Sequence, residues 1–184
     1  ARLSRRAWLA HCSGAAATTT VAGLGMWLPA ASARAASPPL LLVVGDSLSA
    51  EYGIASGSGW VALLEKRLAQ TKRAVRVVNA SISGDTTAGG RSRLAALLAT
   101  HKPTHVLIEL GANDALRGLP LAATRDNLAA MARAARAAGA RVLLVGMQLP
   151  PNYGRRYSDD FAALFAAVAK EERTALVPFL LKGV

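Results

Sequence analysis

The sequence has one cysteine, Cys12, few acidic residues and few aromatic residues, which make up 5% of its 184 positions. A single cysteine excludes a small scaffold held together by disulfides. No uninterrupted apolar run reaches the roughly 18 residues typical of a membrane-spanning helix, so the sequence predicts no such helix. The hydrophobic fraction is nevertheless 52%, which excludes a disordered chain. The length suits one domain with a sizeable core.

Residues 1–36 contain four arginines and no acidic residue. Arg5 and Arg6 precede a weakly apolar stretch over about residues 15–28, and Pro29 is followed by small residues that fit an A-x-A cleavage site. This order is typical of a cleavable signal peptide, and the arginine pair resembles a twin-arginine signal. We therefore expect the twin-arginine export machinery of a bacterium to deliver the protein to the periplasm or outside the cell. An ordinary secretion leader and an uncleaved anchor are the alternatives.

The remaining residues, 37–184, carry a net charge of +7, compared with +11 for the whole chain. Their basic residues are scattered, with one short cluster at Lys72, Arg73 and Arg76, and no aromatic residues are interleaved with a basic stripe. We therefore expect no nucleic-acid partner, because nucleic-acid binding usually needs a concentrated basic patch. A mildly basic, solvated surface is the simpler interpretation.

Short apolar runs alternate with helical spacing from residue 40 to the end of the chain. The predicted strands cover residues 40–44, 74–79, 106–110, 142–145 and 175–179, and helical patterns lie between them. Such alternation predicts a parallel sheet with helices on both faces. We expect one domain over residues 37–184, a flavodoxin-like three-layer α/β/α sandwich with about five strands and without a C-terminal helix.

Three polar loops follow the first three predicted strands, where the carboxyl ends of parallel strands meet at one edge. They are Gly45-Asp46-Ser47, the stretch 79–86 around Gly84, and Gly111-Ala112-Asn113-Asp114. Each has a structural explanation by itself, such as a turn, a glycine with positive φ or a helix cap. Together they would gather a hydroxyl, a backbone N–H and a carboxamide. Acyl transfer requires that combination of a nucleophile and an oxyanion hole.

At these residues the sequence resembles the SGNH (GDSL) hydrolase family, and most closely its bacterial periplasmic branch of thioesterases, arylesterases and lysophospholipases. The resemblance extends over about residues 40–184 and includes the longer strings 79–86, 116–118 and 149–157. It implies that Ser47 is the nucleophile. It also implies that the N–H groups of Ser47 and Gly84 and the side chain of Asn113 form the oxyanion hole.

The resemblance also implies a substrate site for acyl esters, acyl thioesters or lysophospholipids. The loop 111–120 would move when substrate binds, and Leu149 and Pro150 would line the acyl-chain groove. Further substrate contacts are expected from residues next to the nucleophile and Asn113, namely Asp46, Leu48, Asp114 and Leu116. Alternatively, Leu116 and Leu149 simply cover the edge of the sheet. We expect the protein to be a monomer.

A serine esterase also needs a base, which the family takes from a D-x-x-H motif beyond the fifth strand. The chain contains no such motif, and its histidines are His11, His101 and His105. His105 begins the third predicted strand, roughly 20 Å from the end that carries Asn113. A base must come within about 2.6–3.2 Å of the proton that it takes, so we expect weak or no turnover. Either the chain is a piece of a longer enzyme, whose remainder would supply the base and a last helix, or it is a natural fragment.

No metal or organic cofactor is expected. No His, Cys and carboxylate residues have the spacing of metal ligands, and no G-x-G-x-x-G follows the first predicted strand. Two alternative functions stay open. One is a non-catalytic acyl-binding or lipid-binding protein with the same crevice, and the other is a flavodoxin-like nucleotide or flavin binder, which the same fold permits.

Overall fold

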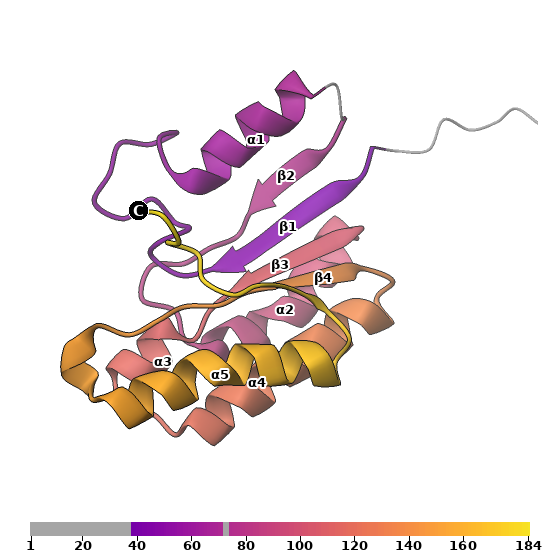
Figure 1. Ribbon diagram of the computed structural model, residues 1–184. Helices are drawn as coiled ribbons and strands as arrows, with labels where there is room; N and C mark the ends of the chain where they lie inside the picture. The colour runs from indigo at the N-terminus through magenta and orange to yellow at the C-terminus, as the bar shows by residue number, and fades with distance from the viewer. Residues whose placement is uncertain (1–37, 72–73) are drawn as a thin grey trace, which may run out of the picture. The chain divides into compact units, whose positions relative to one another are not determined.

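The computed structural model describes residues 38–71 and 74–184. The predicted signal peptide, residues 1–36, lies outside them, as do Lys72 and Arg73 of the basic cluster. Five strands are present (Figure 1): β1 Leu40–Gly45, β2 Arg76–Asn79, β3 His105–Glu109, β4 Arg141–Val145 and β5 Ala175–Val177. The positions of all five predicted strands are therefore confirmed, with small shifts at their ends.

The strands form one parallel sheet in the order β2-β1-β3-β4-β5. This order confirms the predicted flavodoxin-like fold. From β1 the chain passes to β2 on one side and then crosses to β3 on the other, where Glu109 lies opposite Gly45. The carboxyl ends of β1 and β3 therefore lie at a topological switch point. Sheets of this type bind ligands in the crevice beyond such a point.

Helices cover both faces of the sheet, as predicted. α1 lies on one face, and α2, α4 and α5 lie on the other together with the short α3 (Figure 1). The helices and one 3-10 turn have these bounds: α1 Trp60–Gln70, α2 Thr87–His101, α3 Ala112–Leu116, α4 Leu121–Ala137, η1 Pro151–Tyr153 and α5 Arg155–Glu171. No helix in the described part of the chain is long and apolar enough to cross a bilayer.

The two faces of the sheet contribute to two cores of unequal size, because successive strand residues point to opposite sides. The larger core lies against α2, α4 and α5, where Phe161 and Phe165 pack edge to face with their ring centroids 5.2 Å apart. On the other face Val61 of α1 packs in a smaller cluster with residues of β1, β3 and β4. Beside α1 lies a cavity of about 420 Å³ with mainly apolar walls, which include Leu64 and Leu68.

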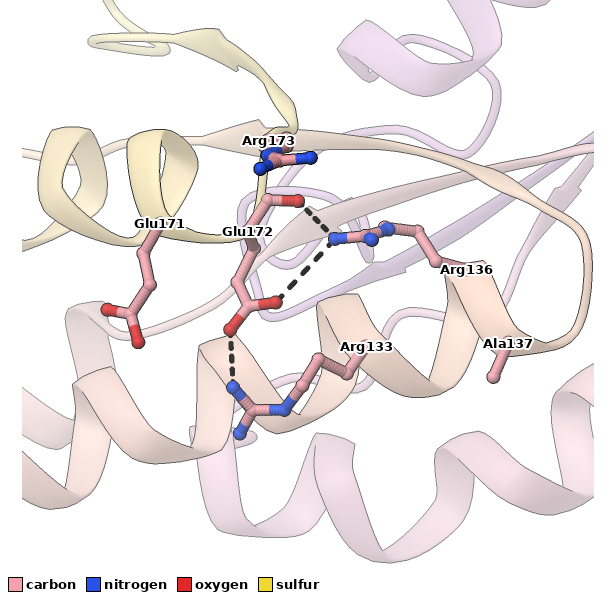
Figure 2. A pocket seen from close by; sticks show the side chains of 6 residues that line it. All are labelled: Arg133, Arg136, Ala137, Glu171, Glu172 and Arg173. Atoms are coloured by element: carbon pink, nitrogen blue, oxygen red, sulfur yellow. Dashed lines mark hydrogen bonds and ion pairs between the residues drawn. The ribbon is translucent and has the colours of Figure 1, made fainter.

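An ion-pair cluster joins the C-terminal ends of α4 and α5 (Figure 2). The side chain of Glu172, which directly follows α5, is buried, and its carboxylate pairs with Arg133 and Arg136 of α4. Arg136 also donates to the backbone carbonyl of Glu172. The cluster lines a cavity of about 510 Å³ at the end of the molecule where β4 and β5 begin. Arginines are favoured here because the C-terminal ends of helices carry partial negative charge.

Candidate active site

Ser47 occupies a tight turn directly after β1. The backbone N–H of Ala50 donates to the carbonyl of Asp46 at 2.9 Å, and that of Tyr52 donates to the carbonyl of Ser47 at 3.2 Å. Asp46 and Ser49 are each 1% exposed, whereas Ser47 is half-buried and Leu48 is exposed. The turn therefore directs two polar side chains into the protein and presents Ser47 toward solvent.

Gly45 is needed where the strand meets this turn. A Cβ atom at Gly45 would lie 2.6 Å from Ser49 Oγ and 2.9 Å from Glu109 Oε2. Both distances are far shorter than van der Waals contact. Neither side chain can easily move away, because Ser49 and Glu109 are both buried. The turn can therefore approach β3 this closely because residue 45 has no side chain.

The Asp46 carboxylate connects the nucleophile turn to Asn113. Its Oδ1 accepts a hydrogen bond from the N–H of Leu48 at 3.1 Å, and its Oδ2 accepts one from Asn113 Nδ2 at 3.1 Å. Burial raises the pKa of Asp46, and the nearby charges of Asp85 and Asp114 raise it further. Asp46 was predicted to contact substrate, and the structure shows that its hydrogen bonds orient the turn and the carboxamide.

Asn113 lies in α3, close to the carboxyl end of β3. Its Nδ2 donates to the Asp46 carboxylate and, at 3.0 Å, to the backbone carbonyl of Asp85. A carboxamide has two N–H donors, and both are engaged within the protein here. Donation to a substrate oxygen, the role implied by the family resemblance, therefore requires one of these two bonds to be exchanged.

The loop after β2 brings Gly84 to the same edge of the sheet. The N–H of Ile82 donates to the carbonyl of Gly45 at 3.0 Å, which fixes the loop beside the nucleophile turn. Gly84 has φ +77°, a left-handed conformation that glycine adopts without strain. Its carbonyl accepts a hydrogen bond from Arg117 Nη2 at 2.8 Å. Arg117 thus ties the loop after α3 to the predicted oxyanion donor.

A cavity of about 290 Å³ lies at this edge of the sheet. Seven residues predicted to form the site are among those that line it: Asp46, Ser47, Leu48, Asn113, Leu116, Leu149 and Pro150. Ala112, Met147, Gln148 and Leu181 also line it, and the sequence analysis did not identify them. Met147 could have been predicted as a site residue, because it follows β4 at the same edge as the other loops. Leu181 had none, since it lies beyond the last predicted strand.

Two predicted site residues do not line the cavity. Gly84 lies next to the cavity, because the following residue, Asp85, accepts a hydrogen bond from Asn113 in the cavity wall. Asp114 is a residue of α3 and is 2% exposed, and its Oδ2 accepts a hydrogen bond from the N–H of Thr87 at 2.8 Å. Its Oδ1 accepts one from Thr124 Oγ1 at 3.3 Å. These bonds anchor α3 to the first turns of α2 and α4.

Neither described histidine is close to Ser47. His105 is the first residue of β3 and lies opposite Leu41, whereas Gly45, next to the nucleophile turn, lies opposite the last residue of β3. His101 ends α2 at the same far edge. His11 lies outside the described residues. Within residues 38–71 and 74–184, no three His, Cys, Asp or Glu side chains are grouped as metal ligands.

Comparison with protein families identifies the relatives of this chain. Residues 43–183 match the model of the GDSL-like lipase/acylhydrolase family. The chain is 61% identical over 149 residues to Esterase TesA of Pseudomonas aeruginosa, with 81% of this chain and 74% of the relative covered. It is 46% identical over 151 residues to thioesterase 1/protease 1/lysophospholipase L1 of Escherichia coli K12, with 82% and 71% covered.

Solved structures show the same similarity. The crystal structure of TesA matches with a TM-score of 0.78 and 62% identity, covering 79% of this chain and 81% of that chain. The psychrotrophic esterase EstA from Pseudoalteromonas matches with a TM-score of 0.72 and 43% identity, covering 75% of each chain. The family match over residues 43–183 spans Ser47, Gly84 and Asn113.

Proposed function

Because the chain belongs to the GDSL-like lipase/acylhydrolase family, we propose that it is a serine hydrolase of acyl esters and thioesters that uses Ser47 as its nucleophile. The observation that carries this proposal is the shared cavity of Ser47 and Asn113 at the carboxyl edge of the sheet, next to Gly84. A hydroxyl beside hydrogen-bond donors is the arrangement that acyl transfer needs.

The reaction has two acyl-transfer steps. Ser47 Oγ attacks the carbonyl carbon and its proton passes to a base, which returns it to the leaving oxygen or sulfur as the C–O or C–S bond breaks to give acyl-Ser47. Water then attacks the acyl-enzyme and gives a proton to the base, which returns it to Ser47 Oγ as the carboxylic acid leaves. In each step the carbonyl oxygen becomes negative, and the N–H groups of Ser47 and Gly84 and the Asn113 carboxamide would stabilise it. Loss of one such donor typically costs roughly 2.7–4 kcal/mol of transition-state stabilisation.

The cavity supports an acyl chain as the bound part of the substrate. Leucines at positions 48, 116, 149 and 181 contribute apolar side chains to its wall. Each CH₂ group buried against such a wall contributes about 0.8 kcal/mol. We propose acyl esters, acyl thioesters and lysophospholipids as substrates, in keeping with the names esterase, thioesterase and lysophospholipase that the relatives carry.

Turnover by the 184-residue chain should be weak or absent, because neither described histidine can take the proton of Ser47. Serine hydrolases stripped of their base retain a residual acceleration of roughly 10³–10⁴ over water from the oxyanion hole and binding. Rapid hydrolysis of a p-nitrophenyl ester by this chain, abolished in Ser47→Ala, would contradict this prediction.

The nucleophile can be tested without turnover. The chain is incubated for a long period with a fluorophosphonate probe, and the modified residue is mapped by mass spectrometry. We expect slow modification at Ser47, none at this position in Ser47→Ala, and unchanged modification in Ser58→Ala. Ser58 is a suitable control because it is exposed and its hydroxyl donates to the carbonyl of Ala55, outside the cavity. Binding of fatty acid without any Ser47 adduct would favour the non-catalytic alternative.

We also propose that residues 1–36 are a cleavable signal peptide that directs export to the periplasm or beyond through the twin-arginine machinery. The support is the arginine pair, the absence of acidic residues and the small residues after Pro29. In a bacterial host, the double substitution Arg5→Lys and Arg6→Lys should leave uncleaved protein in the cytoplasm. Arg2→Lys is the control and should be exported normally. Equal export of both variants would contradict the twin-arginine route.

A further inference from the structure

Glu109 is a buried carboxyl directly beneath the nucleophile turn. It ends β3 opposite Gly45 and is 0% exposed. Its Oε2 accepts hydrogen bonds from Ser49 Oγ at 2.7 Å and, more weakly, from the N–H of Asp46 at 3.4 Å. Its Oε1 is buried and has no hydrogen-bond partner among the described residues. One carboxyl oxygen therefore contacts residues on both sides of Ser47 in the sequence.

Within the part of the chain that the structure describes, no cation forms an ion pair with this carboxyl. The charge that acts on it is that of Asp46 after β1, and Asp46 in turn lies near the charges of Asp85 before α2 and Asp114 in α3. Arg93 of α2 is the nearby cation, but it pairs with Asp85 at 2.9 Å and also approaches the carbonyl of Gly45 at 3.5 Å. Burial first, and the Asp46 charge second, raise the pKa of Glu109 to about 7.

A buried carboxyl without a cation is costly, so its position needs an explanation. Residues 106–108 of β3 are apolar, and a leucine at residue 109 would continue the apolar pattern of Leu107, which points to the same face of the sheet. Such a leucine could not accept the hydrogen bond of Ser49 or that of the Asp46 N–H. The turn that presents Ser47 would then lose these two hydrogen bonds to β3 and keep the one from Asn79 of β2 to the Ser49 carbonyl.

We propose that Glu109 is a positioning residue: its buried carboxyl holds the turn that presents Ser47, and its ionisation changes the charge beneath the reacting groups. This inference rests on the proposed role of Ser47 as nucleophile. The neutral carboxyl keeps an acceptor for Ser49 and adds no negative charge below the carbonyl oxygen that becomes negative. Ser47 should therefore react faster when Glu109 is protonated.

The first test measures the charge directly. Backbone ¹⁵N chemical shifts of Asp46 and Ser47 are followed by NMR from about pH 5 to about pH 9. We expect a step with its midpoint near pH 7 in the wild-type chain and its loss in Glu109→Gln. In Ser49→Ala the midpoint should move upward, because the Ser49 hydrogen bond favours the ionised carboxylate. Glu65→Gln, an exposed change on α1, is the control and should keep the step.

The second test measures reactivity. Glu109→Leu should slow fluorophosphonate modification of Ser47 by about 10-fold to 100-fold, the range expected when a reacting group is displaced by about 1 Å. Glu109→Gln should have the wild-type modification rate at pH 6. Above pH 7 its rate should not show the decrease that ionisation of Glu109 causes in the wild-type chain. A purely structural role would lower the melting temperature of both variants without this difference between leucine and glutamine.

The outcomes separate this inference from the proposed function. Wild-type modification rates in Glu109→Leu, or a step near pH 7 that persists in Glu109→Gln, would overturn the positioning role. If Glu109→Leu does not fold, the NMR titrations of Glu109→Gln and Ser49→Ala still test whether Glu109 ionises beneath the turn. If the wild-type chain shows no adduct at Ser47, the proposed nucleophile fails, and the NMR step still reports whether Glu109 ionises beneath the turn.

Discussion

A glutamate is buried at each end of the sheet, and the two glutamates have different partners. At the end where β4 and β5 begin, Glu172 pairs with two arginines and joins two helices (Figure 2). At the carboxyl end, Glu109 has a serine and a backbone N–H as partners, and no cation among residues 38–71 and 74–184 pairs with it. A paired carboxylate serves the packing of helices, whereas an unpaired one can change its charge near neutral pH. The second kind lies under the candidate active site.

The difference between the two glutamates is tested most directly by replacing Glu109 with glutamine. Its pKa is raised in the folded protein from an ordinary value of 4.5 to about 7, so its protonated form stabilises the folded state, and this stabilisation is lost as the pH rises through 7. In urea unfolding, we expect the wild-type chain to lose on the order of a few kcal/mol between about pH 5 and about pH 8.5 through Glu109.

Glu109→Gln should lack this loss. Asp46 is present in both proteins, so the difference reports Glu109 together with its interaction with Asp46. Glu65→Gln serves as the matched control and should show the same pH dependence as the wild-type chain. If Glu109→Gln and the wild-type chain lose the same stability over this range, Glu109 does not ionise as described.

The next largest effect is expected for Gly45→Ala, which adds a methyl group between the turn and Glu109. Overpacking of this kind typically costs about 1–3 kcal/mol. Ser49 supplies two of the three closest atoms, so the double change Gly45→Ala and Ser49→Gly should recover part of the loss. Thermal unfolding of the two single variants and the double variant measures this coupling. Additive losses would show that the close approach is not the cause.

A smaller effect is expected at the opposite end, from Glu172→Gln. Its arginine partners remain half-exposed, so we expect a loss of about 1–2 kcal/mol, less than for a fully buried pair. The neighbouring Glu171→Gln is the matched control, because the pair of Glu171 with Arg125 is exposed on both sides and should change stability by less than about 0.5 kcal/mol. Equal losses in the two variants, measured in urea, would remove the distinction between buried and exposed pairs.

The smallest effect on stability is expected for Arg117→Gln, because Arg117 is exposed and surface substitutions usually stay within about 0.5 kcal/mol. Its hydrogen bond to the carbonyl of Gly84 should instead restrain the loop. We expect faster hydrogen exchange at the N–H of Asp85, which donates to the carbonyl of Ile82 within this loop. Arg155→Gln, on the first turn of α5, is the control. Unchanged exchange in Arg117→Gln would show that this contact does not restrain the loop.

The fold and much of the site could be predicted from the sequence, because both depend on local patterns. The apolar run 40–44 ends at Gly45, as buried parallel strands often do, and the loops after β1, β2 and β3 carry the family motifs. Since parallel strands end at one edge, Ser47 and Asn113 were expected to meet, and they line one cavity.

Other features depend on contacts between distant residues and could not be predicted. Glu109 was visible as a charged residue in an apolar strand, but its partner Ser49 lies 60 positions earlier. The carboxamide of Asn113 was predicted to face substrate, and no local pattern indicated that Asp46 and Asp85 accept both of its N–H groups. Asp114 was placed with the substrate residues because it follows Asn113, but the helical turn directs it toward Thr87.

Leu181 has a practical consequence for work with this protein. Its side chain lies in the wall of the Ser47 cavity, and the chain after β5 returns to the loop that follows β1 (Figure 1). An affinity tag or fluorescent fusion joined after Val184 would begin three residues from that wall and could crowd the entrance. Labels for binding or imaging experiments are better attached to the exposed residues of α1, on the opposite side of the sheet from α5.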